Sequence, residues 1–180
     1  MHNPLKNTFS GKKVLITGNT GFKGAWLTLM LNSLNADVYG FSDCIPWPKS
    51  ILSKSWVKNE IVQFWGKIQN LENFYNVYNS VKPDFLFHLA AQPLVKTSIR
   101  DPWNTFQVNA QGTVNVLETL RKVDSSCVGL IVTTDKVYKN TEKGNFFKEN
   151  DPLEGREPYS ISKVCAEYSV DAYEKLFNKN

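Results

Sequence analysis

The sequence has little of what marks secreted, membrane-spanning or metal-stapled proteins. It contains only three cysteines, Cys44, Cys127 and Cys165, and none of them has the CxxC spacing of a zinc site. No apolar run approaches the roughly 18 residues that a membrane helix requires, and residues 1–13 lack the apolar region of a signal peptide. We therefore expect three buried or half-buried thiols without disulfides, no metal, no membrane contact and a cytoplasmic location.

A strong excess of one charge is missing as well. The 21 Lys and Arg residues and the 17 Asp and Glu residues leave a net charge of +4, which is spread along the chain. A nucleic-acid footprint is only weakly indicated, and we expect no such partner. The 42% hydrophobic and 21% charged content of the 180 residues is typical of a globular protein, so we expect one domain over residues 1–180.

Strand, turn and helix signals follow one another most clearly near the N-terminus. An apolar run predicts a buried strand over 13–17, and a helical pattern follows over 22–34. Three glycines lie between and within these elements. Gly18 would permit a tight turn, Gly21 the close approach of a phosphate, and Gly24 the close packing of helix on strand. Backbone N–H groups at such a helix start favour a pyrophosphate, so we prefer a dinucleotide site over a plain turn, although the spacing is not GxGxxG.

The rest of the chain alternates between strand and helix signals. We expect further strands over 37–41, 61–65, 85–90 and 129–133, helices over 71–80, 101–122 and 159–178, a polar lead-in over 1–12 and an undecided stretch over 49–60. This alternation predicts an α/β fold, a Rossmann-type doubly wound parallel sheet of five strands flanked by helices. The complete fold has a sixth strand, so we expect the chain to be truncated before that strand, with exposed apolar surface beside strand five.

Helical spacing also predicts which side chains are buried. The first long helix places Trp26, Leu27, Met30, Leu31 and Leu34 on one stripe. The last helix does the same with Ile161, Val164, Tyr168, Ala172 and Leu176. We expect both stripes to face the core.

An acidic residue just beyond the second strand of such a fold can hold a ribose hydroxyl. Asp43 stands at this place, and the nearest cation is Lys49. The lack of an adjacent cation for a 2′-phosphate favours NAD over NADP. An ordinary solvated loop acid is an equally good reading of Asp43.

Two residue pairs have types suited to catalysis. Tyr159 and Lys163 are four apart on a predicted helix and share a face, so the ammonium can favour a phenolate base and also reach a ribose hydroxyl. Asp135 and Lys136 follow the fifth strand and can act as an acid and base pair if burial adjusts them, or form an exposed ion pair. His88, within an apolar strand, is better explained as a core residue.

Several motifs resemble the extended short-chain dehydrogenase/reductase family. They are TGNTGFKG, HLAAQPLV, NAQGT, TTDKVY and DPLEGREPYSISK, and the resemblance runs from Phe9 to Phe177. Within this family they are most similar to CDP-glucose 4,6-dehydratases of bacterial deoxysugar pathways. Other dehydratases of the family usually carry Asp-Glu in place of Asp135-Lys136, and epimerases carry neither acid nor base there.

The resemblance implies a reaction with tightly held NAD. Tyr159 removes the proton of the sugar C4 hydroxyl, and Thr134 hydrogen-bonds the C4 oxygen. Lys136 takes the C5 proton and Asp135 protonates the departing C6 hydroxyl. Hydride returns to C6 and gives a 4-keto-6-deoxy sugar nucleotide from CDP-glucose. A nucleotide-binding remnant without activity and another sugar-nucleotide epimerase or dehydratase are the alternatives.

The resemblance also implies cofactor contacts and an assembly. The cofactor residues are Gly18, Gly21, Phe22, Lys23, Gly24, Ala90 and Lys163, and the assembly is a homodimer through the helices over 104–122 and 159–178. The sequence departs from the family pattern in three places. Lys67 replaces the Asp that accepts from adenine, which a donor-only ammonium cannot do. Glu154 replaces a glycine, and we expect the C-terminal substrate-binding lobe to be absent.

Overall fold

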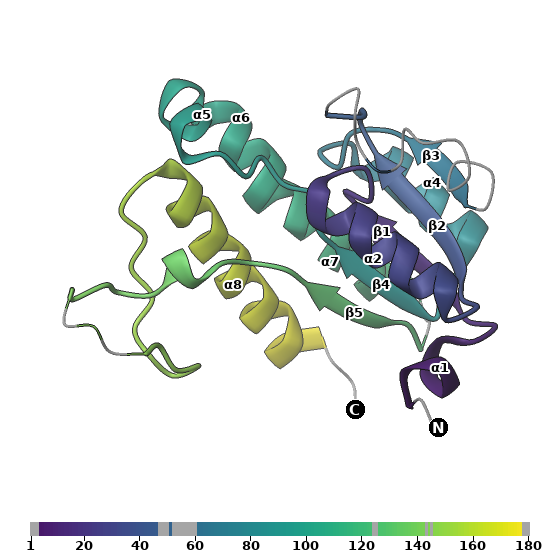
Figure 1. The fold of residues 1–180 in the computed structure, drawn as a ribbon. Helices are drawn as coiled ribbons and strands as arrows, with labels where there is room; N and C mark the ends of the chain where they lie inside the picture. Colours follow the sequence, from purple (N-terminus) through teal and green to yellow (C-terminus); the bar gives the residue numbers. More distant parts are fainter. Residues whose placement is uncertain are drawn as a thin grey trace.

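The computed structural model describes residues 4–46, 51, 61–123, 126–142, 144 and 146–177, and it contains one parallel sheet (Figure 1). The sheet has five strands in the order β3-β2-β1-β4-β5, which confirms the predicted fold. They are β1 (Lys13–Thr17), β2 (Asp37–Ser42), β3 (Val62–Trp65), β4 (Phe85–His88) and β5 (Val128–Ile131). Apart from Ile51, the undecided stretch 49–60 lies outside the described residues.

The helices are more divided than the sequence suggested. They are α1 (Pro4–Phe9), α2 (Phe22–Ser33), α4 (Leu71–Val81), α5 (Val95–Arg100), α6 (Pro102–Phe106), the π-helix η2 (Gln107–Gln111), α7 (Gly112–Lys122), the 3-10 helix η3 (Asp135–Val137) and α8 (Pro158–Phe177). None of these described helices is long and apolar enough to cross a membrane. The predicted helix over 101–122 is thus α6, η2 and α7 in succession.

Alternate residues of β1 face opposite layers, which makes the fold a three-layer sandwich. Leu15 belongs to a core shared with Phe74 of α4 and Val116 of α7. Its neighbours Val14 and Ile16 belong to the other core, which contains Leu31 of α2, the helix that crosses the near face of the sheet in Figure 1. A central strand covered on both faces explains why its sequence is an unbroken apolar run.

Three predicted element boundaries were wrong. The expected polar lead-in forms α1, because the ring of Phe9 packs on Phe85 with their centroids 5.0 Å apart and anchors the segment to the sheet. The helix α5 was not foreseen. The strand predicted over 85–90 ends at His88, and the strand predicted over 129–133 is β5, which runs from Val128 to Ile131.

The predicted buried stripes were also wrong in part. On α2, Trp26 and Met30 are 56% and 45% exposed, because the helix lies so close to the preceding loop that small residues such as Gly24 and Ala25 face inward. The buried residues of α8 are Ser160, Ser162, Lys163 and Ala166, whereas Ile161, Tyr168, Ala172 and Leu176 are exposed. That inward face can be small and polar because its hydrogen bonds are made to neighbouring elements.

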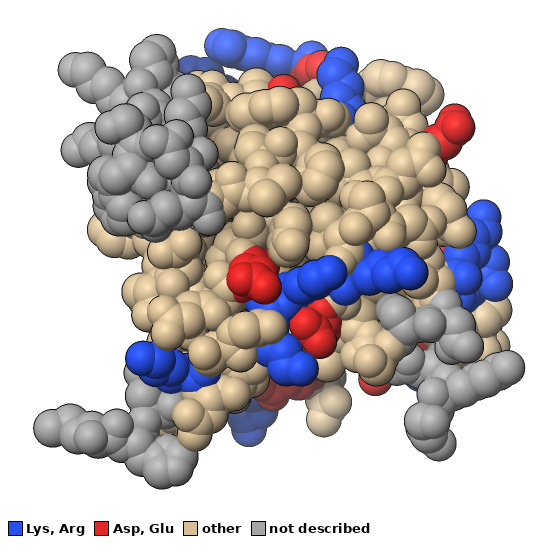
Figure 2. Space-filling model, turned by 90° about the vertical axis from the view of Figure 1, so that its right-hand side faces the viewer, with Lys and Arg blue, Asp and Glu red and all other residues tan. Residues whose placement is uncertain are grey.

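The surface carries apolar and charged groups in different places. Val128 and Leu130 of β5 are exposed, as expected for the surface beside strand five. On the face shown in Figure 2, basic and acidic side chains lie interspersed among uncharged ones without a continuous basic surface. The thiols of Cys44, Cys127 and Cys165 are free; Cys127 and Cys165 are half-buried as expected, whereas Cys44, in the loop after β2, is exposed.

Candidate active site

The Gly-rich loop is packed so tightly that two of its glycines cannot carry a side chain. Gly18 has φ of +72°, and a Cβ there would lie 2.6 Å from the backbone nitrogen of Ala90. A Cβ on Gly24 would lie 2.2 Å from the carbonyl oxygen of Gly18. Gly24 therefore brings α2 against its own preceding loop, and not against a strand as the spacing suggested.

The start of α2 has free hydrogen-bonding capacity that fits a phosphate. Gly21 is the N-cap residue and makes no side-chain capping bond, so the N–H groups of the first turn have no side-chain acceptor. A Cβ on Gly21 would meet only the Gly18 carbonyl, at 3.3 Å, which leaves the outer side of the turn open. Phe22 and Lys23 are exposed in this turn. These features fit the pyrophosphate of a dinucleotide.

The end of β4 is tied to the Gly-rich loop by a buried histidine. Thr17 Oγ1 accepts from the Ala90 N–H (3.2 Å) and lies 2.7 Å from His88 Nδ1, so its own hydrogen points to His88. His88 Nε2 then donates to Thr113 Oγ1 at 3.3 Å, which assigns the Nε2–H tautomer. Burial, helped by the charge of Lys163, lowers the pKa of His88 to about 3, so the ring is neutral. His88 is a core residue, as predicted.

The predicted Tyr159–Lys163 pair lies at the start of α8. Lys163 is only 4% exposed, and its Nζ donates to the Val132 carbonyl at 3.0 Å. Burial lowers the pKa of Lys163 to about 8; the Glu167 carboxylate opposes this shift and the Lys23 ammonium adds to it. The Lys23 ammonium of α2 thus acts on Lys163 of α8, so the start of α2 lies near the first turns of α8.

The Thr-Asp-Lys segment forms one turn after β5. The Thr134 hydroxyl accepts from the Lys136 N–H at 3.4 Å and donates to Asp135 Oδ1 at 3.2 Å. Asp135 and Lys136 are both exposed, so the burial expected for an acid and base pair is not found in the chain as described. Neither joins a salt bridge among the described residues, which also disagrees with the ion-pair alternative.

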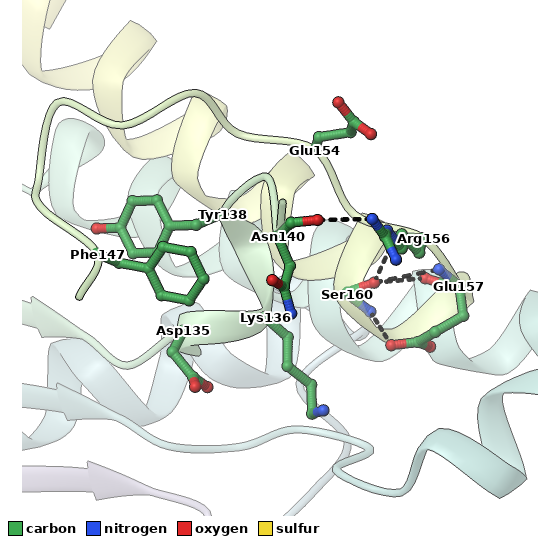
Figure 3. A pocket seen from close by; sticks show the side chains of 9 residues that line it. All are labelled: Asp135, Lys136, Tyr138, Asn140, Phe147, Glu154, Arg156, Glu157 and Ser160. Carbon is green, nitrogen blue, oxygen red and sulfur yellow. Dashed lines mark hydrogen bonds between the residues drawn. The ribbon is translucent and has the colours of Figure 1, made fainter. Parts of the chain in front are cut away.

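Asp135 and Lys136 line a pocket of about 220 Å³ (Figure 3). On one side Tyr138 stacks on Phe147 with ring centroids 5.2 Å apart. The opposite side is formed by Arg156 and by Ser160, the residue next to Tyr159. A volume of this size, with donors, acceptors and an aromatic wall, suits a single polar ring better than a whole dinucleotide.

The two residues considered for adenosine recognition lie at one edge of the sheet. Asp43 follows β2 and Lys67 follows β3, and both are exposed. The Gly66 N–H donates to the Ser42 carbonyl at 3.0 Å, which ties the two turns together. The structure therefore brings Asp43 and Lys67 to the same end of neighbouring strands.

Two residues near Tyr159 were missed from the sequence. The Asn109 side chain, 0% exposed, accepts from the Gln92 N–H and donates to Ser162 Oγ at 3.0 Å. Glu157 precedes α8 and accepts from the N–H of Tyr159 at 2.7 Å. Two signals in the sequence could have identified them. One is an amide on the inward stripe of a predicted helix, and the other is an acid just before Pro158 at a helix start.

The chain is similar to sugar-nucleotide enzymes over nearly its whole length. It is 38% identical to a CDP-glucose 4,6-dehydratase of Salmonella typhimurium, over 96% of this chain and 48% of that relative. It is 30% identical to a CDP-paratose 2-epimerase of Salmonella typhi, over 93% of this chain and 54% of that relative. A solved UDP-glucose 4-epimerase of Thermus thermophilus in complex with NAD has a TM-score of 0.78 and 25% identity, covering 92% of this chain and 51% of that one.

These similarities cover nearly the whole of this chain but only part of each relative. The chain spans about half the length of the curated relatives it matches. The model of the family described as GDP-mannose 4,6 dehydratase matches residues 15–179. The chain therefore belongs to the GDP-mannose 4,6 dehydratase family, within the extended short-chain dehydrogenase/reductases that act as sugar-nucleotide dehydratases and epimerases.

Proposed function

We propose that this chain is the cofactor-binding part of an NAD-dependent sugar-nucleotide 4,6-dehydratase that converts CDP-glucose to CDP-4-keto-6-deoxyglucose. The proposal rests on the pocket in which Asp135 and Lys136 lie beside the start of α8, the helix that contains Tyr159. An acid and an amine at this place match the dehydratase pattern and not the epimerase pattern. The similarity to a CDP-glucose 4,6-dehydratase supports this substrate.

The cofactor in this proposal is NAD, held at the uncapped start of α2. Gly18 permits the tight turn of the loop and Gly21 leaves room for the pyrophosphate. Asp43 accepts from a ribose hydroxyl and Lys163 donates to the other ribose. Lys163 fits this role because it lies one turn after Tyr159 on α8, and because an ammonium with a pKa of about 8 is still mostly protonated, and thus a donor, at neutral pH. When bound there, NAD would supply the hydride acceptor for sugar C4 and the hydride donor for C6.

The chain's own residues move the protons of the proposed reaction. Tyr159, as phenolate, takes the proton of the C4 hydroxyl, while Thr134 bonds the C4 oxygen. Lys136 takes the C5 proton, which the new ketone makes acidic. Asp135 protonates the departing C6 oxygen, which leaves as water. Lys136 returns its proton to C5, and the proton gained by Tyr159 balances the one lost by Asp135.

Two other functions are supported by specific observations. A different sugar-nucleotide enzyme is favoured by the similarity to a CDP-paratose 2-epimerase. A remnant that keeps the fold but has no activity is favoured by the exposure of Asp135 and Lys136, and by Lys67, which cannot accept from adenine and so weakens nucleotide binding.

Conversion of CDP-glucose deuterated at C4 separates these functions. A dehydratase gives a 4-keto product that has lost one water and retains the deuterium at C6, detected by mass spectrometry and NMR. An epimerase product keeps the substrate mass, and an inactive chain returns the substrate unchanged. The Lys136→Ala variant should stop the loss of water while reduced cofactor accumulates, which a bystander lysine would not do.

We further propose a homodimer, formed through the helices over 104–122 (α6, η2 and α7) and over 159–178 (α8). On α6 and α8 the large side chains of Trp103, Tyr168 and Leu176 are 76%, 57% and 73% exposed, and an interface would cover such apolar surface. Light scattering should give twice the chain mass, and the Tyr168→Lys variant should give the monomer. A monodisperse monomer for the unmodified chain would exclude this assembly.

A further inference from the structure

The acid Glu157 has no role in the proposed reaction, yet it bonds to the backbone of Tyr159. Its Oε2 accepts from the Tyr159 N–H at 2.7 Å, and its Oε1 accepts from the Ser160 N–H at 3.0 Å. In return the Ser160 hydroxyl accepts from the N–H of Glu157 at 3.2 Å. This reciprocal pair satisfies N–H groups that the first turn of a helix leaves open (Figure 3).

The same carboxylate also reaches a second helix. Ser98 of α5 is fully buried, and its hydroxyl lies 3.2 Å from Glu157 Oε2 and 2.7 Å from the Val95 carbonyl. Its single hydrogen is therefore shared between the carbonyl and the carboxylate. Glu157 thus connects the start of α8 to α5, a helix that the sequence did not reveal.

We propose that Glu157 is a positioning residue for Tyr159: by bonding the Tyr159 amide and α5 at once, it fixes the backbone from which the phenol projects. This rests on the proposed function only in taking Tyr159 as the base. Tyr159 is the second residue of α8, and terminal turns of helices open more readily than their interiors. On the other side, its carbonyl accepts from Ser162 Oγ at 2.6 Å. The two contacts hold the residue at both ends of its backbone.

Side-chain length separates this positioning role from simple capping. An asparagine at 157 caps helices as well as any residue, but it is one methylene too short to hold Ser98 as well. An alanine at 98 removes the α5 contact and leaves the cap intact. If Glu157 only caps the helix, both variants behave as the unmodified chain; if it positions Tyr159, both release the phenol.

The test uses the chain labelled with 3-fluorotyrosine and observed by fluorine NMR. The Tyr159 signal is assigned by its loss in Tyr159→Phe, and Tyr168, farther along the same helix, serves as the internal reference. We expect Glu157→Asn and Ser98→Ala to move the Tyr159 signal toward its position in the unfolded chain, with the Tyr168 signal and the helical circular dichroism unchanged. Glu157→Ala, which also removes the cap, should in addition speed exchange of the Tyr159 amide by roughly five- to thirtyfold.

An unmoved Tyr159 signal in both Glu157→Asn and Ser98→Ala would overturn the proposal and leave Glu157 as a cap. If Glu157→Asn does not fold, Ser98→Ala decides alone, because it changes neither the cap nor the charge. The readout needs neither NAD nor catalysis. A chain that proves inactive can therefore still show the positioning effect, and an active one can still lack it.

Discussion

Acid should destabilise this protein through one histidine. His88 is 1% exposed, and burial, reinforced by the Lys163 charge, lowers its pKa from 6.5 to about 3. Between these two values the unfolded chain binds a proton that the folded chain does not, so stability is complete above pH 6.5 and is lost as the pH falls toward 3. Each pH unit in this window costs about 1.4 kcal/mol, which gives about 2 kcal/mol between pH 7.5 and pH 5.0.

The assay is urea unfolding followed by tryptophan fluorescence at several pH values from 7.5 to 5.0. The matched variant is His88→Gln, whose amide can still bond Thr17 and Thr113 but does not titrate. The other histidine, His2, is present in both proteins and cancels in the comparison. We expect the free energy of unfolding to fall by about 2 kcal/mol more in the unmodified chain than in His88→Gln. Equal pH slopes would refute the buried neutral histidine.

Three further predictions concern the cofactor site and the pocket. Gly18→Ala should lose NAD binding in calorimetry and destabilise the fold more than Gly11→Ala, because both have positive φ but only at Gly18 does a Cβ meet backbone; equal effects would contradict this. Lys67→Asp should tighten NAD binding by about tenfold, since a carboxylate can accept from adenine; unchanged affinity would place adenine elsewhere. Glu154→Gly should leave the urea midpoint unchanged, because the salt bridge to Lys139 is solvent-exposed; a large drop would show that the loop depends on it.

The sequence predicted those parts of the fold that depend on local patterns. The buried strands read as apolar runs because both faces of a parallel strand are covered, and the turn after β1 required glycines for steric reasons. Short elements were missed. The six residues of α5 have too little periodicity to be recognised, and α1 is fixed by Phe9 packing against residues more than seventy positions away.

The candidate site was only partly predictable for a related reason. Residue types and spacing identified Tyr159, Lys163, Asp135 and Lys136, but their surroundings come from distant segments. The burial of Lys163 depends on the Val132 carbonyl, and Asp135 and Lys136 are exposed because the turn after β5 projects from the sheet. The helical spacing of α8 predicted an apolar inward face, but the side chains there are polar. Hydrogen bonds, which the helical pattern does not show, allow these polar groups to be buried.

The central claim is that the loop after β1 holds NAD with its nicotinamide ring beside Tyr159. The most direct test is the nuclear Overhauser effect between the nicotinamide C4 proton and the ring protons of Tyr159, in the chain saturated with NAD and labelled selectively at tyrosine. The account predicts a cross-peak between these two groups. Bound NAD whose nicotinamide protons contact other residues but not Tyr159 would contradict it.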